Sequence, residues 1–230
     1  KISSIGISYQ MHGLVVVDKN GSPLRGSIIW CDSRAVNIGN EAFEKLGQEK
    51  CMSHLLNSPG NFTASKLKWV KDNEPNIYEK IYKYMLPGDF IAYILTGEIN
   101  TTRNGLSEGI IWDYKNNSIA DWLLNHYGID SNLTPDLVDN FSNQGATNLK
   151  SSNETGLNVG VPITYRAGDQ PNNALALNVF DNGEVAASGG TSGVIYSITN
   201  NLESNEPSRI NHFAHVNYNN NNKSIGKLLC

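Results

Sequence analysis

Cysteine and long hydrophobic runs are both scarce in this sequence. The 230 residues contain three cysteines, spaced far apart, at Cys31, Cys51 and Cys230. An odd and dispersed set of this kind argues against a disulfide framework and indicates a reducing compartment. No segment approaches the roughly eighteen consecutive apolar residues that a membrane-spanning helix needs. The sequence therefore predicts a soluble, cytoplasmic protein without a membrane partner.

Blocks of charge of one sign are missing as well. The net charge is -4 and no cluster of Lys and Arg occurs, so there is no electrostatic reason to expect nucleic acid as a partner. Small neutral molecules fit better. The chain also lacks a methionine at its first position, and both ends fall inside apolar, strand-like runs. We expect that it continues in both directions as part of a longer protein.

The residues that are present alternate between strand-like and helix-like patterns. Extended runs are expected at residues 2–8, 14–18 and 26–30. Four helices should follow in a row, at 33–46 after a Ser33 cap, from Thr63 or Ser65 to the residues before Pro75, at 87–96, and at 118–127. After Pro135 we predict a strand ending at Arg166, a helix from about Pro171 to Val179, a hairpin of 183–190 with 192–199, and a surface turn at 219–222. This order is typical of an α/β protein.

The first polar segment that could carry chemistry is QMHG, residues 10–13. It follows a strand directly, and loops at strand ends are where α/β proteins keep their functional residues. Gln10 and His12 could hydrogen-bond a polyhydroxylated ligand while Met11 packs beside its carbons. The alternative is a tight turn between two strands with a solvated His12.

The second segment is WCDSR, residues 30–34. Trp30 could supply an apolar face for a sugar, and Asp32 and Arg34 could hold each other and the hydroxyls of the ligand in place. The alternative is that Asp32 caps the helix that follows.

The third segment is AGDQ, residues 167–170, at the junction of a predicted strand and helix. The carboxylate of Asp169 would lie at a strand tip beside a helix N-terminus, where the helix dipole favours the ionised form. A fixed acceptor there can orient a hydroxyl and take up its proton, as phosphoryl transfer to an alcohol requires. The alternative is again an N-cap.

A glycine-rich turn, GGTSG, follows about twenty residues later. Its glycines allow a backbone to approach a phosphate closely, and its hydroxyl groups add donors. The candidate phosphate-binding residues are Gly190, Thr191, Ser192 and Gly193. A glycine-rich hairpin without a ligand is the alternative.

The order of these segments is more specific than any one of them. The chain reads GISYQMHGLVVVD, IIWCDSR, FTASKLKWV, PGDFIAYILTGE, AGDQ and GGTSGV, and this succession resembles the FGGY family of carbohydrate kinases over nearly the whole chain. The QMHG turn is most similar to the xylulokinase branch of that family. One departure is TTRNGLSEGIIWD, residues 101–113, which stands where an SDASG-like form is common in the family.

The resemblance implies an actin-like, ribonuclease H-like fold with sugar and ATP in a cleft between two domains. It implies that Asp169 is the catalytic base, that Met11 and His12 contact the sugar, that Gln170 lies beside the base, and that Thr191 approaches the ATP phosphates. Residues 1–167 would belong to the N-terminal domain and 168–230 to the start of the C-terminal domain. The phosphate loop of the family would precede Lys1, and most of the nucleotide domain would follow Cys230.

The resulting functional prediction is an ATP- and Mg²⁺-dependent kinase that phosphorylates the terminal hydroxyl of a ketopentose, D-xylulose first among them. Ribulokinase, gluconokinase and glycerol kinase activities are the alternatives within the family, and a non-catalytic sugar-binding protein is the alternative outside it. Sugar and ATP are the expected partners, with no protein ligand named for the metal and a homodimer left open. We expect the isolated fragment to phosphorylate poorly or not at all.

Overall fold

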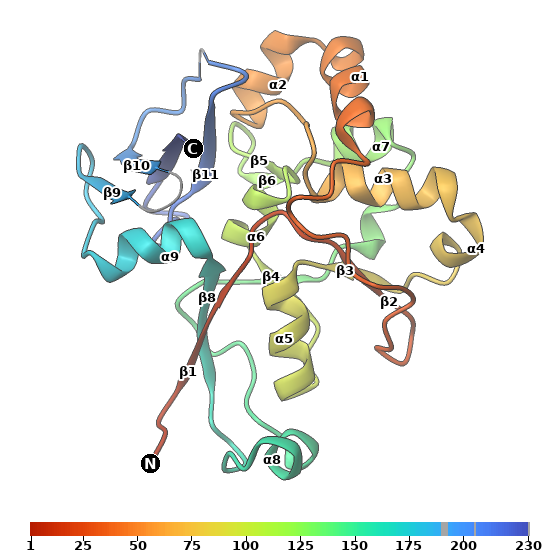
Figure 1. Ribbon diagram of the computed structural model, residues 1–230, viewed down its shortest axis with the longest axis vertical. Coiled ribbons are helices and arrows are strands. Elements are labelled where there is room, and N and C mark those ends of the chain that lie inside the picture. Colours follow the sequence, from red (N-terminus) through yellow and green to blue (C-terminus); the bar gives the residue numbers. More distant parts are fainter. Residues whose placement is uncertain (190–192, 205, 230) are drawn as a thin grey trace.

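The structure is a computed structural model that describes residues 1–189, 193–204 and 206–229. Its centre is a pair of parallel strands, β1 (Ile5–Tyr9) and β8 (Ile163–Gly168), that lie side by side although they are far apart in the sequence (Figure 1). In their register Tyr9 pairs with Gly168, so the two strands end together. Whatever follows each strand therefore begins at the same edge.

Most of the helices form a helical part on one side of this pair (Figure 1). They are α1 (Val36–Leu46), α2 (Gln48–His54), α3 (Thr63–Asn73), α4 (Pro75–Tyr78), α5 (Pro87–Thr96), α6 (Arg103–Glu108), α7 (Asp121–His126), the 3-10 turn η1 (Ser131–Leu133) and α8 (Leu149–Thr155). Three short strand pairs connect them: β2 (Val15–Val17) with β3 (Lys83–Met85), β4 (Asn100–Thr102) with β7 (Asp136–Val138), and β5 (Trp112–Asp113) with β6 (Ser118–Ile119).

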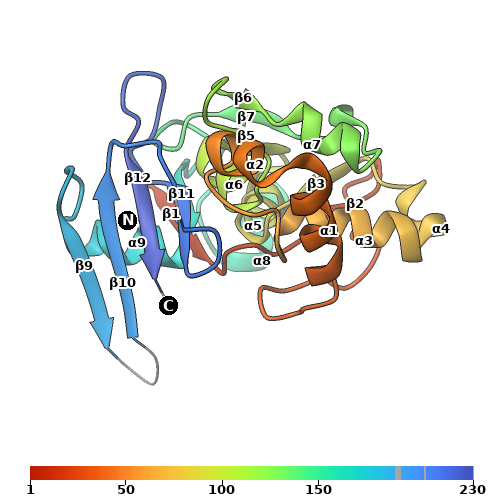
Figure 2. The same cartoon turned by 90° about the horizontal axis from the view of Figure 1, so that it is seen from above.

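A separate antiparallel sheet lies on the other side, as the view from above shows (Figure 2). Helix α9 (Asp169–Ala176) leads from β8 into this sheet. Its strands, in the spatial order β11, β12, β10, β9, are β11 (Ile210–Ala214), β12 (Ile225–Leu229), β10 (Gly193–Thr199) and β9 (Val185–Gly189).

The helical part and the sheet share one hydrophobic core. Buried side chains of both belong to the same cluster, from Leu67 and Leu106 on helices to Tyr196 and Phe213 on strands. Hydrogen bonds reinforce this contact, because the Asn57 side chain accepts from the His212 N–H (2.8 Å) and donates to the His212 carbonyl (2.6 Å). Packed side chains, rather than a flexible link, therefore join the helical part and the sheet.

Several predicted elements are confirmed. The helix expected at 87–96 is α5, with Pro87 first and Gly97 in the left-handed region (φ 84°) as its C-cap. A glycine is favoured there because it has no Cβ to clash in that conformation. The predicted hairpin is β9 with β10, and the asparagine run at 219–222 is a turn closed by the Asn219 N–H and the Asn222 carbonyl.

Other expectations are wrong in detail. Residues 26–30 form a single bridge, Ile28 to Leu14, rather than a strand. Helix α1 begins after Ala35 without a side-chain cap, so Ser33 does not cap it. Ser118 lies in β6, and the fourth predicted helix begins only at Asp121. The four predicted helices are also not consecutive, because three short helices that we did not predict, α2, α4 and α6, lie between them. Helices this short form only when tertiary packing stabilises them.

Among the residues that the structure describes, no helix combines the length and the apolar character needed to cross a membrane.

Candidate functional site

A pocket of about 300 Å³ opens where β1 and β8 end. Its walls come from the turn after β1, from α9 and from the antiparallel sheet, so it lies between the two parts of the molecule. The lining residues are Gln10, Met11, His12, Trp30, Asp169, Gln170, Val194 and Leu228. The structure thus brings QMHG and AGDQ together, as both follow strands that end at one edge. Five of the predicted site residues line this pocket: Met11, His12, Trp30, Asp169 and Gln170.

His12 is held in one orientation at the pocket wall. Its backbone lies in the left-handed region (φ 64°), and its Nδ1 is 2.9 Å from the main-chain oxygen of Glu108. Burial lowers the pKa of His12 to about 4, so the ring is neutral at pH 7. Because a carbonyl can only accept, Nδ1 carries the hydrogen and Nε2 is left as an acceptor. The alternative of a solvated histidine is wrong.

Aromatic rings hold the imidazole from two sides. The Phe62 ring meets it edge-on at a centroid distance of 4.7 Å, and the Phe213 ring lies 5.1 Å away. Phe62 belongs to the helical part and Phe213 to strand β11, so the position of His12 depends on how the two parts pack.

Lys66 supports the same turn and was missed from the sequence. Its Nζ donates to the carbonyls of His12 (2.9 Å) and Ile29 (3.0 Å), which joins the QMHG turn to the segment carrying Trp30. Burial lowers its pKa to about 8. The available signal was periodicity: Lys66 falls on the helical face that Thr63, Leu67 and Val70 bury, where a lysine needs a polar partner.

Asp169 is the first residue of α9, and Gly168 is its N-cap, so the N-cap alternative for Asp169 is wrong. Its Oδ1 accepts a hydrogen bond from the Gln170 N–H (3.0 Å). The side chain is exposed at the pocket, but the protein around it raises the pKa of Asp169, with burial as the main cause. The expectation that the helix terminus would favour the charged form is therefore corrected: the desolvation penalty exceeds the effect of the backbone donors.

Asp32 and Arg34 hold each other, as expected. The guanidinium is 2.9 Å (Nε to Oδ1) and 2.7 Å (Nη2 to Oδ2) from the carboxylate, which lowers the pKa of Asp32 to about 2. Neither lines the pocket, and Arg34 stacks on the Trp69 ring at 4.5 Å. The helix that follows has no side-chain cap, so the capping alternative for Asp32 is also wrong. Trp30 does line the pocket. The residue is 61% exposed, and its main-chain N–H donates to Gln10 Oε1 (2.9 Å).

The predicted phosphate turn is described only in part. Gly190, Thr191 and Ser192 lie outside the described residues. Gly193 begins β10, and a Cβ added to it would meet none of the described residues within 4 Å. The backbone at Gly193 is therefore open, as an approach to a ligand would need.

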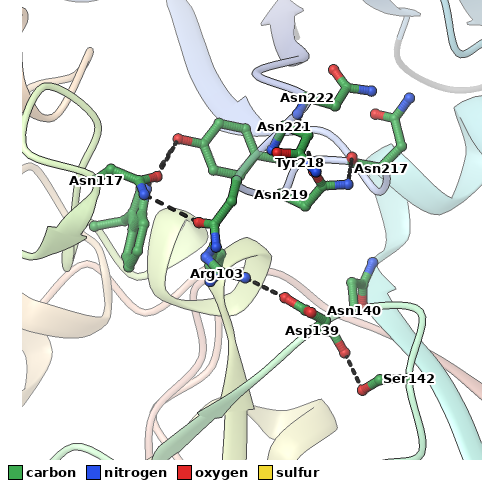
Figure 3. Close-up of polar contacts among 12 residues, drawn as sticks. Arg103, Asn117, Asp139, Asn140, Ser142, Asn217, Tyr218, Asn219, Asn221 and Asn222 are labelled. Carbon is green, nitrogen blue, oxygen red and sulfur yellow. Dashed lines mark hydrogen bonds and ion pairs between the residues drawn. The ribbon is translucent and has the colours of Figure 1, made fainter.

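A second depression, of about 330 Å³, lies between the β11–β12 turn and the segment after β7. It is rich in asparagine, and many of its polar groups already pair with one another (Figure 3). Arg103 pairs with Asp139, Tyr218 donates to Asn117 (3.4 Å), and Asn219 donates to the Asn217 carbonyl (3.2 Å). None of the predicted site residues that the structure describes lines it, and we regard it as a structural contact.

Metal-binding side chains do not gather in the part of the chain that the structure describes, where no group of three or more His, Cys, Asp or Glu residues is placed to hold an ion.

Comparisons with known proteins agree with this geometry. Residues 1–176 match the model of the N-terminal domain of the FGGY family of carbohydrate kinases. A xylulose kinase of Staphylococcus xylosus is 31% identical over 93% of this chain and 44% of its own length. Among solved structures, the xylulose kinase of Rhodospirillum rubrum (TM-score 0.87, 24% identity) covers 98% of this chain and 45% of its own. The glycerol kinase of Plasmodium falciparum with ADP (TM-score 0.89, 22% identity) covers 99% and 46%.

These overlaps confirm the predicted actin-like α/β fold. The chain spans a little under half the length of the relatives it matches.

Proposed function

Because the chain belongs to the FGGY family of carbohydrate kinases, we propose that the protein containing it transfers the γ-phosphoryl group of ATP to the terminal hydroxyl of a ketopentose. D-xylulose is the sugar proposed first, since xylulose kinases are among its relatives. In this proposal residues 1–167 form the sugar-binding domain, 168–230 begin the nucleotide-binding domain, and the protein works in the cytoplasm.

One observation carries the proposal: Asp169 and the QMHG turn line the same pocket. A carboxylate at the end of one strand and a histidine after its neighbour can hold one hydroxylated molecule between them. The raised pKa of Asp169 supports a role as a proton acceptor, because a base works best when its pKa is closer to the working pH.

The proposed chemistry is a direct in-line transfer. The sugar hydroxyl oxygen forms a bond to the γ-phosphorus, the bond from that phosphorus to the β,γ-bridging oxygen breaks, and the hydroxyl proton passes to the Asp169 carboxylate. ADP leaves with the electron pair of the broken bond. Water must be kept from the pocket, because it would otherwise compete with the sugar for the phosphoryl group.

Recognition of the sugar rests on hydrogen bonds and one apolar face. A neutral, hydrated sugar offers little hydrophobic gain, so several aligned polar groups must discriminate it. His12 Nε2 is an acceptor, Gln170 can donate or accept, and Met11 and Trp30 give apolar surface. Asp32 and Arg34, which follow Trp30 in the chain, would act as an ion pair.

ATP and Mg²⁺ are part of the proposal, and the described residues fit them only in part. The open backbone at Gly193 suits a nearby phosphate, and Gly190, Thr191 and Ser192 are proposed to continue that surface. Asp169 is a carboxylate within reach of the pocket, but no cluster of acidic residues accompanies it among the described residues. We therefore assign no residue to the metal.

The test is a coupled assay of ADP release with the full-length natural protein that contains this chain. D-xylulose, D-ribulose, gluconate and glycerol are offered separately with Mg-ATP, and the proposal expects the highest kcat/KM for D-xylulose. A preference for another of these sugars would keep the kinase and replace the substrate. Sugar binding by calorimetry without ADP release for any of them would instead identify a non-catalytic sugar-binding protein. The isolated chain is expected to show little or no turnover.

A further inference from the structure

Glu108 is a buried acid that touches both halves of the candidate pocket without lining it. It is the last residue of α6 and its side chain is fully buried. It belongs to the segment GLSEG, residues 105–109, to which we assigned no role from the sequence. Its position is directly behind the point where β1 and β8 end.

One carboxylate oxygen of Glu108 joins the two strand tips. Oε1 accepts hydrogen bonds from the Tyr9 hydroxyl (3.3 Å) and from the Gly168 N–H (3.0 Å). Tyr9 and Gly168 are register partners, and they directly precede Gln10 and Asp169. The single oxygen thus ties together the starts of the two segments that line the pocket.

The main chain of Glu108 makes the third contact. Its carbonyl oxygen accepts from His12 Nδ1 (2.9 Å), the bond that leaves His12 Nε2 free to accept. Side chain and backbone of one residue therefore set the position of Gly168 and the tautomer of His12. No other residue described in the structure is hydrogen-bonded to both Gly168 and His12 in this way.

The surroundings of Glu108 differ from those of an ordinary buried acid. No Lys or Arg forms an ion pair with it among the described residues, and Oε2 is buried without a hydrogen-bond partner there. Burial, with the charges of Asp89 and Asp169, raises the pKa of Glu108 well above its usual value. Since Oε1 accepts twice, a proton on this group would sit on Oε2, and the side chain would be neutral.

The contact between Glu108 and Gly168 is closely packed. A Cβ placed on Gly168 would lie 2.7 Å from Glu108 Oε1 and 2.4 Å from Met11 Cγ. The carboxyl group therefore fits against bare backbone at the strand tip, with no room for it to move toward β8.

We propose that Glu108 is a positioning residue of this site, whose side chain clamps the tips of β1 and β8 and whose carbonyl orients His12, so that Asp169 and His12 face one bound sugar. This role rests on the proposed kinase function. Glu108 itself does not touch the substrate. Its contribution is geometric, and misplacement of a reacting group by about 1 Å can cost on the order of 100-fold in rate.

The first experiment compares two substitutions in the full-length natural protein. Glu108→Gln keeps the shape and one acceptor oxygen for Tyr9 and Gly168, whereas Glu108→Ala removes the clamp. We expect Glu108→Ala to lower kcat/KM for the sugar about 100-fold with the KM for ATP within about twofold of wild type. Glu108→Gln should restore kcat/KM to within about threefold.

Asp113→Ala is the matched control. Asp113 is about as buried and accepts from His54, Asn116 and Trp122, but it does not contact the pocket. We expect this variant to lower the melting temperature as Glu108→Ala does and to leave kcat/KM unchanged. A loss of kcat/KM in Asp113→Ala that matches Glu108→Ala would show a general structural effect and overturn the proposal.

The second experiment reads His12 without any turnover. Nitrogen-15 NMR of the imidazole distinguishes a protonated Nδ1 from a protonated Nε2, and His12→Gln assigns the signal. We expect the Nδ1–H form in wild type and in both Glu108 variants, because each substitution keeps the main-chain carbonyl that accepts from Nδ1. An Nε2–H form in wild type, wild-type kcat/KM in Glu108→Ala, or equal damage in both Glu108 variants would each overturn the proposal. If wild type phosphorylates no sugar, the proposed function fails, and an Nδ1–H ring in wild type then supports the orienting role of the Glu108 carbonyl on its own.

Discussion

Two buried carboxylates beside strand β8, Asp89 and Glu108, differ in the groups that neutralise or bind them. Asp89 pairs with Arg166 (3.0 Å) and also accepts from Thr101 (2.8 Å) and the Leu86 N–H (3.2 Å). Glu108, two residues further along the strand at Gly168, has a tyrosine and one backbone N–H but no ion-pair partner among the described residues. Burial raises the pKa of both acids, and only Asp89 has a cation that opposes the shift.

This difference distinguishes Asp89, which stabilises the fold, from Glu108, which lies beside the candidate site. A buried charge that is paired with an opposite charge holds elements together and has little left to offer a ligand. Arg166 extends the Asp89 network to Asn100 (2.6 Å to its side chain), which fixes β4 against β8. Glu108 instead lies where the strands stop and the pocket begins, and its incomplete pairing fits a region arranged around a ligand.

Removing the buried charge of Asp89 should have the largest effect on stability. Asp89→Ala leaves Arg166, which is fully buried, without its counter-charge, and we expect the free energy of unfolding to fall by about 3–5 kcal/mol. Urea denaturation followed by circular dichroism measures it. The double variant Asp89→Leu/Arg166→Met removes both charges and should recover much of the loss. A change below about 1 kcal/mol in the single variant would contradict a structural role for the pair.

Removing the charge of Asp169 should lower turnover rather than stability. Asp169→Asn takes away the proposed proton acceptor, and we expect kcat for sugar phosphorylation by the full-length protein to fall about 1000-fold. Sugar affinity, measured by calorimetry, should stay within about threefold. Asp139→Asn is the control, since that carboxylate lies in the other depression, paired with Arg103. Equal losses of binding and turnover in Asp169→Asn would assign Asp169 to binding.

Acid pH should lower the stability of the fold through buried histidines that have no anionic partner among the described residues. Burial lowers the pKa of His212 and of His215 to about 4, against a usual value of 6.5. Because the unfolded chain takes up these protons first, stability present above pH 6.5 is lost as pH falls from 6.5 to about 4. The loss is at most about 3 kcal/mol for each residue.

Variants isolate this effect from the buried carboxyl groups, whose raised pKa values act in the opposite direction. His212→Asn should flatten the dependence of unfolding free energy on pH between 6.5 and 4, when urea denaturation is repeated along that range. An identical pH dependence in wild type and variant would rule out His212 as a source of acid sensitivity.

The smallest expected effect tests the tight packing at the strand tip. Gly168 has φ near -58°, which alanine can adopt, so the cost of Gly168→Ala comes from the added methyl group against Met11 and Glu108. We expect about 1–3 kcal/mol of lost stability. Gly189→Ala is the matched control, because no atom of the part of the chain that the structure describes lies within 4 Å of its added Cβ, and it should change stability by less than about 0.5 kcal/mol. Equal melting temperatures for the two variants would contradict close packing at Gly168.

Local patterns predicted the elements whose signals are local. Pro87 and Gly97 mark the two ends of α5, and alternating apolar residues mark the β9–β10 hairpin. The pattern failed at 26–30, where an apolar run makes one bridge only, because a strand needs a neighbour along its length and sequence periodicity does not show whether one is present.

In the candidate site, too, some residues were predicted from local patterns and others were missed. Met11, His12, Trp30, Asp169 and Gln170 were named from the segments QMHG, WCDSR and AGDQ, and all five line the pocket. Lys66 and Glu108 were missed because each sits in a helix and acts through backbone groups of other segments. Asp32 and Arg34 pair with each other, but their distance from the pocket wall depends on how α3 packs beneath them.

By itself the sequence determined which residues end strands, where helices stop, and which family the succession of motifs resembles, since these follow from backbone preferences and residue order along the chain. Only the tertiary structure decided that Gly168 pairs with Tyr9, that Glu108 fills the space behind them, and that Asp169 and His12 share a pocket. It also decided the direction in which the pKa of Asp169 moves. Desolvation depends on every atom packed around a group, and most of those atoms come from distant parts of the chain.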